Sequence, residues 1–419
     1  MASTAPSATL AGGRITRRQG RAWTAAVFAV FAIDGLSLSS WMVRIPAVRD
    51  LLGASTLSMG LLVVGLSCGS MVGLGSSSHL IARFGAKHTM TVASLTMLVG
   101  LAFAGVGTTF PSYSAILIGL FVFGLGTSTT DVAMNLSGAA NERVMGRTLM
   151  PLFHALFSLG TVGGAGLGAL AARVALPVVW HLAIVAIVGV VSLSIAVRHV
   201  QPESLSVEDD GHQSTSWRER IAVWKQSATL LIGLIMLGMA FAEGAAGDWL
   251  ALAMVDKRGT TNAGGAVIYG VFVAAMTVGR VVGVPALDRF GRVPVLRASA
   301  VSGAIGLCLV IFVPSVPMDM VGTVLWGLGA SLGFPVGMSA AADDPRNAAA
   351  RVSAVATIGY LAFLVGPPVL GFLGGHVGLL NAFILVLVLI AVAAFVAPAA
   401  RERRNPPTQP DQTGRWGRS

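Results

Sequence analysis

The sequence predicts an all-α membrane protein in which twelve transmembrane helices form two pseudo-symmetric bundles of six. Three observations predict this fold class. About twelve apolar stretches, each roughly 20 residues long, fill the chain, and a helix of that length spans a bilayer. Of the 419 residues, 54% are hydrophobic and 11% are charged, against about 25% charged residues in soluble domains. One loop motif also occurs twice, once in each half of the chain.

The predicted elements fall into two groups around one long polar segment that contains proline, serine and charges of both signs. The apolar run that starts at Trp23 is too long for a cleaved signal peptide, so we interpret it as the first retained helix. The predicted regions are a cytoplasmic tail 1–21, a bundle 22–198, a cytoplasmic linker 199–226, a bundle 227–398 and a basic tail 399–419. The predicted spans are 22–43, 57–80, 90–108, 113–139, 148–171, 176–197, 228–251, 266–287, 294–313, 318–340, 351–374 and 377–398.

The distribution of basic residues predicts the orientation in the membrane. With these spans, 22 Lys and Arg residues lie on the side of the two termini and 5 lie on the other side. The positive-inside rule then places both termini in the cytoplasm. The net charge of +10 is therefore located at helix ends and does not indicate a nucleic-acid partner. Arg greatly outnumbers Lys, which is typical of GC-rich bacterial genomes, and we expect a multi-pass protein of the bacterial plasma membrane.

An internal repeat supports the division into two halves. Arg83-Phe84-Gly85 follows the second predicted span, and Arg289-Phe290-Gly291 follows the eighth, 206 residues later. Duplicated halves of this kind are typical of secondary transporters, whose substrate site lies where the two halves meet. We expect the first, fourth, seventh and tenth helices to line that site.

Ionisable residues inside the predicted spans are candidates for function. Each costs about 2.5–3.5 kcal/mol at the centre of a membrane helix on insertion scales. The two cysteines lie inside apolar spans, so we expect neither a disulfide framework nor a metal cluster, and we expect no cofactor. The candidates for proton or substrate translocation are Asp34, Asp131, Asn135, His154, Glu243, Asp248 and Arg280.

Asp131 and His154 form the first hypothesis. At about 1.5 Å of rise per residue, Asp131 lies about 12 Å and His154 about 10 Å from the same membrane surface. They belong to consecutive spans, so a contact between them is geometrically feasible, and Asn135 shares the helix face of Asp131. A carboxyl group beside an imidazole can bind and release a proton. The alternative is a structural hydrogen bond between helices, worth about 0.6 kcal/mol on average.

Glu243 and Asp248 lie on the seventh span, five residues apart. In a regular α-helix they would point about 140° apart, so both can face one ligand only if the helix breaks. The intervening Gly and Ala residues permit such a break. We expect Glu243 to face a cavity, whereas Asp248 is more simply explained as a cap near the outer interface.

Arg280 and Asp34 each have two explanations. Arg280 needs a partner or a wet cavity. Its nearest candidate partner is Glu243, although the estimated depths differ by about 10 Å, and structural neutralisation competes with anion binding. Asp34 is followed by Gly35 and several serines, so it is either a proton site or a group that these serines satisfy.

These motifs resemble the major facilitator superfamily over essentially the whole chain. Asp288-Arg289-Phe290-Gly291-Arg292 is similar to the cytoplasmic loop motif of that family. The resemblance implies a gating role for Arg83, Gly85, Asp288, Arg289, Gly291 and Arg292. The first copy departs from the motif because Ala82 stands where the motif has Asp, so the charge contact implied for that position lacks its acid.

The chain more narrowly resembles a bacterial branch related to fucose permeases. The matching segments include Asp131-Val132-Ala133-Met134-Asn135, the His154 segment, Glu243-Gly244-Ala245 and Gly279-Arg280. In fucose permease an acidic residue at the position of Asp131 serves proton-coupled sugar uptake. The acidic partner of that family's first helix precedes a proline, but Met42 occupies the corresponding position here and Asp34 lies further upstream, so sugar specificity is not implied.

Together, the residues and the resemblance predict a secondary active transporter and not an enzyme. We expect a monomer that moves a small solute, such as a sugar or related metabolite, by alternating access coupled to H⁺, with the lipid bilayer as its surroundings. Export of a metabolite or toxic compound is the first alternative. A membrane enzyme that uses Asp343-Asp344 to hold Mg²⁺, or a receptor, is the alternative from another class. Na⁺ coupling also stays open.

Overall fold

The computed structural model describes residues 9–10, 13–146, 149–201, 222–343 and 348–401. Within these ranges the chain is almost entirely helical, apart from the short antiparallel pair β1 (Thr9–Leu10) and β2 (Gly13–Arg14). Eleven described helices are long and apolar enough to cross a membrane, and one of them, 51 residues long, contains two crossings. The all-α fold with twelve crossings is therefore confirmed for the described residues.

The first half of the chain forms six crossings in five long helices and one short helix. Helix α1 begins earlier than the predicted 22 because Thr16 and Gln19 form a reciprocal cap in which each side chain bonds the other's backbone N–H. The apolar run therefore marks where α1 enters the membrane and not where it starts. The elements are α1 (Arg17–Met42), α2 (Ile45–Leu52), α3 (Thr56–Val106), α4 (Tyr113–Met145), α5 (Met150–Arg173) and α6 (Val178–Ala196).

The second half follows the same plan with more interruptions. Three of its crossings are built from more than one helical segment. The elements are α8 (Ser227–Ala245), the π-helical η1 (Ala246–Leu250), α9 (Ala251–Arg258), α10 (Asn262–Phe290), α11 (Arg292–Phe312), α12 (Val316–Ala330), α13 (Gly333–Ala341), α14 (Ala348–Val377), α15 (Leu379–Val396) and the 3₁₀ turn η2 (Ala397–Ala400).

The repeated Arg-Phe-Gly motif makes the same backbone turn in both halves. Gly85 interrupts α3 with φ 79° and ψ 158°, and Gly291 separates α10 from α11 with φ 76° and ψ 170°. A positive φ of this kind is open to glycine at little steric cost. The repeat detected in the sequence is thus a repeat of backbone geometry.

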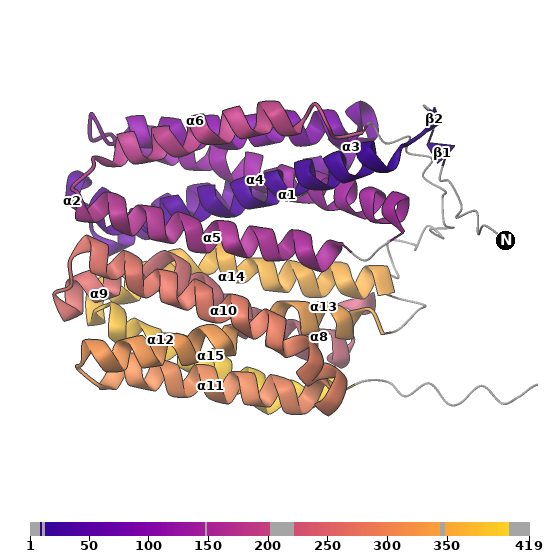
Figure 1. Cartoon of the computed structure of the whole chain (residues 1–419). Helices are drawn as coiled ribbons and strands as arrows, with labels where there is room; N and C mark the ends of the chain where they lie inside the picture. The colour runs from indigo at the N-terminus through magenta and orange to yellow at the C-terminus, as the bar shows by residue number, and fades with distance from the viewer. Residues whose placement is uncertain (1–8, 11–12, 147–148, 202–221, 344–347, 402–419) are drawn as a thin grey trace, which may run out of the picture.

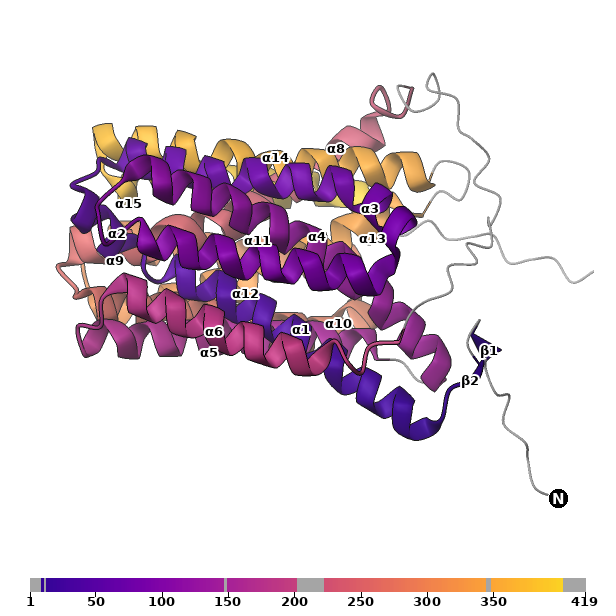
Figure 2. The same cartoon turned by 90° about the horizontal axis from the view of Figure 1, so that it is seen from above.

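The two groups of helices lie side by side with their axes roughly parallel (Figures 1 and 2). Helices α1–α6 form one layer and α8–α15 the other. The described ends of the chain, at β1 and at η2, lie at the same end of the bundle, which we call the termini side; the other end is the opposite side (Figure 1). Most of the predicted linker 199–226 and of the basic tail 399–419 lies outside the described residues, as do residues 1–8 and 11–12 of the predicted N-terminal tail.

Within each layer, the helices are held together by close packing and, in the second half, by one buried ion pair. A Cβ added to Gly69 on α3 or to Gly124 on α4 would strike a backbone carbonyl of the facing helix, so only glycine allows this approach. In the second half, Arg258 bonds the fully buried carboxylate of Asp319 at 2.7 and 3.2 Å. Its guanidinium also donates to the carbonyls of Val310 and Val313. This arginine therefore fastens the end of α9 to α11 and α12.

Candidate functional site

A cavity of about 510 Å³ lies where the two layers face each other. Its lining comes from α1, α3, α4 and α5 in the first half and from α8, η1, α10 and α14 in the second. The tenth span, α12 with α13, contributes none of these lining residues, so the prediction for that helix was wrong. Its Trp326 instead packs against Phe272 and Phe383, with ring centroids 5.6 and 5.3 Å apart.

The opposite side of the cavity is closed by direct contact between α3 and α14. Gly60 lies against the backbone of Pro367 and Pro368, and the Ser67 hydroxyl donates to the carbonyl of Phe363 at 2.7 Å. Further along α3 towards the termini side, Ser70, Met71, Leu74 and Gly75 line the cavity. The two helices therefore meet at the opposite side.

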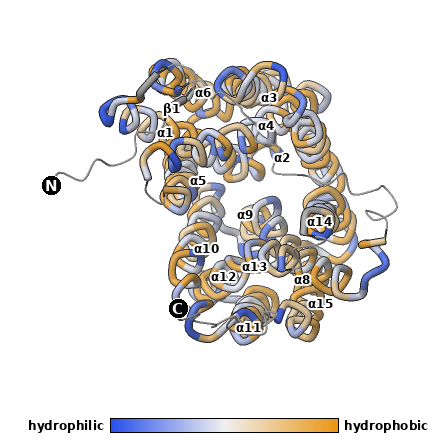
Figure 3. Tube along the Cα trace, turned by 90° about the vertical axis from the view of Figure 1, so that its right-hand side faces the viewer, coloured by the Kyte–Doolittle hydropathy of each residue, from blue (hydrophilic) through white to orange (hydrophobic). Residues whose placement is uncertain are grey.

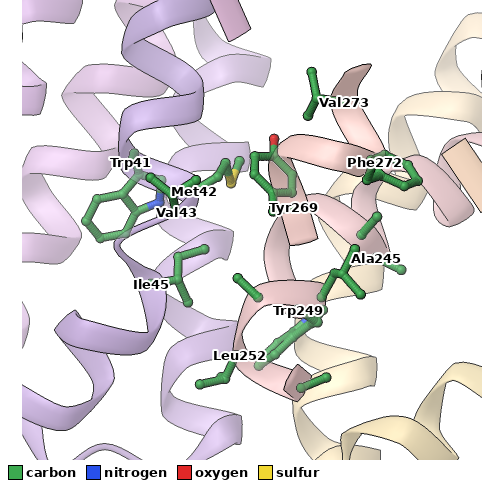
Figure 4. Close-up of a cluster of buried hydrophobic side chains, with 14 of the residues drawn as sticks. Trp41, Met42, Val43, Ile45, Ala245, Trp249, Leu252, Tyr269, Phe272 and Val273 are labelled. Atoms are coloured by element: carbon green, nitrogen blue, oxygen red, sulfur yellow. The ribbon is translucent and has the colours of Figure 1, made fainter. Parts of the chain in front are cut away.

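Bulky side chains complete this closure. Trp41 and Ile45 of the first half and Trp249 and Leu252 of the second belong to one buried cluster, and each is at most 1% exposed (Figure 4). Next to it, Arg49 on α2 forms an ion pair with Asp256 on α9, across the boundary between the halves. An apolar plug and a charge pair thus seal the opposite side.

Figure 3 views the bundle from the termini side, with α1–α6 in one layer and α8–α15 in the other. Charged residues that line the cavity between these layers are accessible to solvent. Arg280 and Glu243, which line the cavity, keep 33% and 25% of their side-chain surface exposed. Asp131 on α4 is exposed as well. The structure is therefore a one-sided state, open towards the termini and closed at the opposite end.

Arg280 and Glu243 form the ion pair that the sequence suggested. The guanidinium of Arg280 on α10 donates to the Glu243 carboxylate at 3.0 Å. This contact joins the eighth and seventh spans inside the cavity. The depth estimates had separated the two residues by about 10 Å on Cα rise alone, and a long arginine side chain can bridge such a gap.

The π-helical turn η1 explains how Glu243 and Asp248 share one cavity. In a π-helix the backbone bonds run from residue i to i+5, so a turn takes in about one residue more than in an α-helix, and Asp248 is brought towards the helix face of Glu243. Gly244, Gly247 and Asp248 join Glu243 in the lining. The break that the Gly and Ala residues permitted is therefore a change of helical type, and Asp248, only 7% exposed, is a cavity residue and not an outer cap.

The Asp131 neighbourhood matches the sequence hypothesis in part. Asn135 donates to the Asp131 carboxylate at 3.0 Å and to its carbonyl at 2.8 Å, as their four-residue spacing suggested. In the described part of the chain, His154 has no hydrogen bond to Asp131. Its ring packs edge-on against Phe31 at 5.3 Å, and the charge that acts on it is that of Arg280. Neither Asn135 nor His154 lines the cavity.

Asp34 lines the cavity and is 2% exposed. One of its carboxylate oxygens, Oδ1, has no hydrogen-bond partner among the described residues. The hydroxyls of Ser37 and Ser40 likewise have no partner there, and the hydroxyl of Ser39 interacts with Tyr269, so these serines do not satisfy the Oδ1 atom of Asp34. Asp131 is close enough to act on Asp34 electrostatically. The two acids therefore interact across one part of the cavity.

The residues of the repeated loop motif lie on the termini side, outside the cavity. The guanidinium groups of Arg83 and Arg289 each lie 5.4 Å from the ring of the following phenylalanine. Asp288 is exposed. Arg292 bonds Asp343 at 2.5 and 3.0 Å and Ser339 at 2.8 Å, which ties the start of α11 to the end of α13.

This contact bears on the enzyme alternative. The pairing with Arg292 occupies Asp343, one of the two acids considered for Mg²⁺, and Asp344 lies outside the described residues. Among the residues that are described, no group of three or more His, Cys, Asp or Glu side chains could hold a metal ion.

Sequence reasoning missed the neutral polar lining. These groups carry no unusual insertion cost, so the search for charges inside spans passed over them. Two aromatic residues, Tyr269 and Tyr360, also line the cavity, whereas Trp41 and Trp249 belong to the buried cluster at the opposite side. The missed hydroxyl residues are Ser67, Ser70, Thr127, Ser128, Thr161 and Thr357.

Comparison with known sequences identifies relatives along most of the chain. A profile described as Major Facilitator Superfamily matches residues 244–418. An uncharacterized transporter, y4wD, of Sinorhizobium fredii is 30% identical over 377 residues, which is 90% of this chain and 97% of the relative. An uncharacterized MFS-type transporter of Yersinia pestis is 30% identical over 376 residues, covering 88% of this chain and 94% of its own.

Solved structures agree on the fold. The nucleoside transporter NupG, as a point variant, superposes with a TM-score of 0.74 at 12% identity, covering 91% of this chain and 99% of its own. An inward-facing, unoccupied bacterial homolog of the lysosomal transporter Spinster gives 0.72 at 13% identity, covering 92% and 98%. The transporter FucP in its outward conformation gives 0.64 at 15% identity, covering 91% and 100%. At these identities the likeness concerns the fold alone.

Proposed function

Because the chain belongs to the Major Facilitator Superfamily of membrane transporters, we propose that it carries a small polar solute across the membrane by alternating access, in exchange or in company with protons. The observation that carries this proposal is the cavity itself. It lies between the halves, is sealed at the opposite side and is open towards the termini side. A site that faces one side at a time is what alternating access requires.

The contacts at the seal define the movement. To open the opposite side, the halves must separate α3 from α14 and break the Arg49–Asp256 pair. The ion pair Arg280–Glu243 and the Asn135–Asp131 bonds each lie within one half, so a rigid rocking of the halves can keep them. We propose that the residues of the repeated loop motif help to close the termini side. These residues are Arg83, Gly85, Asp288, Arg289, Gly291 and Arg292.

We propose Asp131 as the proton-responsive group. It lines the cavity, is accessible from the termini side and has no cationic partner among the described residues. Taking an unpaired carboxylate out of water costs several kcal/mol, whereas a protonated carboxyl is far cheaper to enclose. No direct contact supports a role for His154 in adjusting the proton affinity of Asp131. Because the charge of Arg280 acts on His154, we propose that the protonation of His154 responds to the Arg280–Glu243 ion pair instead.

The remaining assignments extend the same proposal. We place the termini side in the cytoplasm of a bacterial plasma membrane, on the basis of the 22 basic residues of that side. We further propose that a monomer is the transporting unit, with 199–226 as the linker between bundles 22–198 and 227–398. The solute direction, import or export, follows from the sign of the coupling that the experiment below measures.

The test uses the purified full chain in liposomes with an imposed pH gradient. A panel of sugars, amino sugars, nucleosides and organic amines is screened for flux while internal pH is recorded. We expect flux of at least one compound with matched proton movement, and loss of the coupling in Asp131→Asn. The surface variant Thr109→Ala is the control, because Thr109 is exposed in a loop and lies outside the cavity. Flux that ignores the pH gradient, or an Asp131→Asn protein with unchanged coupling, would refute the assignment.

A further inference from the structure

The charged groups of the cavity are unbalanced. Its lining contains four carboxyl groups, those of Asp34, Asp131, Glu243 and Asp248, and one guanidinium, that of Arg280. The guanidinium is already engaged by Glu243 at 3.0 Å. Three carboxyl groups therefore face the cavity without a cationic partner in the described part of the chain. A solute that enters meets carboxyl groups that no basic side chain of the described residues neutralises.

Asp34 offers the cavity a carboxylate oxygen that the described residues leave without a hydrogen-bond donor. It is 98% buried, lines the cavity, and its Oδ1 has no hydrogen-bond donor among the described residues. Buried polar atoms are normally satisfied, and an unsatisfied carboxylate oxygen is among the most costly exceptions. A donor supplied by the cargo would satisfy it.

The remaining lining fits a positively charged donor. Tyr269 and Tyr360 line the same cavity as the acids. Aromatic rings attract cations through the negative face of their π-system, more strongly where water is displaced. Carboxyl groups and aromatic rings together are the combination that binds ammonium groups. The cavity volume of about 510 Å³ is within the range of small-molecule sites.

We propose that the cavity selects solutes that carry a positive charge, a protonated organic amine with further polar groups, and that Asp34 and Asp248 hold the ammonium group. Both acids lie nearer the sealed end of their helices than the open end: Asp34 is closer to Met42 than to Arg17, and Asp248 is closer to Arg258 than to Ser227. The inference rests on the proposed transport function, because it names the class of its solute.

The experiment measures the sign of the cavity field without needing the solute. Cys68 and Cys308 are replaced by serine, and a single cysteine is introduced by Thr357→Cys in the cavity or by Thr109→Cys in an exposed loop as the matched control. Each purified protein reacts with two thiol reagents of similar size, the cationic trimethylammonioethyl and the anionic sulfonatoethyl methanethiosulfonate. The ratio of the two rate constants is compared between the sites.

We expect the cation-to-anion rate ratio at Thr357→Cys to exceed that at Thr109→Cys by about tenfold or more, since charges interact strongly in a low-dielectric cavity. Adding Asp34→Asn and Asp248→Asn should remove most of that excess. Equal ratios at the two sites, a preference for the anion, or an excess that survives both substitutions would overturn the inference. The labelling needs no transport, so a failed flux assay with a strong cation preference would refute the proposed function and leave this inference standing.

Discussion

Replacing Gly60 should hold the opposite side of the protein open. Gly60 lies on α3 at the point where that helix meets α14. A Cβ at this position would lie 2.7 Å from the carbonyl oxygen of Pro367 and 3.2 Å from the Cα of Pro368. Both are backbone atoms of the other half, so no side-chain rotation can relieve the overlap.

The size of the effect follows from the geometry. Ordinary contact with a Cβ begins at 3.4 Å, so the helices must separate by about 0.7 Å, and by more for valine. Overpacking a close interface costs about 1–3 kcal/mol. Because this contact exists only while the opposite side is closed, the cost falls on that state alone. The equilibrium should therefore shift towards the opposite-open state by about 5- to 150-fold.

Electron-electron distance measurements on spin labels can test this in lipid nanodiscs. One pair, Thr109 and Val316, spans the halves on the opposite side, and a second pair, His88 and Arg297, spans them on the termini side. In Gly60→Val the first distance should lengthen and the second shorten. The control is Gly163→Val, because a Cβ at Gly163 would meet nothing within 4 Å. If Gly60→Val kept wild-type distances for both pairs, the close α3–α14 approach would not be what closes the protein.

Two further ion pairs give separable outcomes. Arg49→Gln or Asp256→Asn should increase the population open on the opposite side by less than about fivefold, because a partly exposed ion pair contributes about 0–1 kcal/mol. The charge-swapped double variant Arg49→Asp with Asp256→Arg should restore the wild-type distance distribution. A larger defect in the double variant than in the single variants would contradict a charge contact. Arg258→Ala or Asp319→Ala should lower the melting temperature in detergent strongly, since stranding one member of a buried pair costs about 3–5 kcal/mol. Replacing both by Met and Leu should recover much of that loss, and an unchanged melting temperature in the single variants would show that the pair is not structural.

The sequence predicted the helices and the repeat because their signals are local. Apolar length alone fixes where a helix can cross, and Arg-Phe-Gly marks turns that Gly85 and Gly291 make with the same positive φ. The start of α1 was placed too late because Thr16 and Gln19 cap the helix within a polar segment. The apolar composition indicates where the helix enters the membrane, whereas the capping residues determine where the helix begins.

The cavity was less predictable because it depends on how two halves meet. The tenth span was expected in the lining from its position in the repeat, yet its Trp326 is fully buried among other rings. In the sequence, only the small residues before Asp248 pointed to the π-helical turn η1, although this turn changes the side of the helix on which Asp248 lies. Asp131 and Arg280 were found because charges inside spans are costly wherever they lie.

The same cost suggests why the carrier should cross only when it is loaded. During each cycle both ends of the cavity must close together, which would seal the exposed Asp131 from water beside the already buried Asp34 and Asp248. Enclosing one unpaired carboxylate costs several kcal/mol, and three of them in one cavity would also repel one another. A bound ammonium group or a proton removes most of that cost. The acids that are unpaired in the open state would thus make closure conditional on cargo, and coupling follows from the electrostatics of the empty cavity without a separate gate for each ligand.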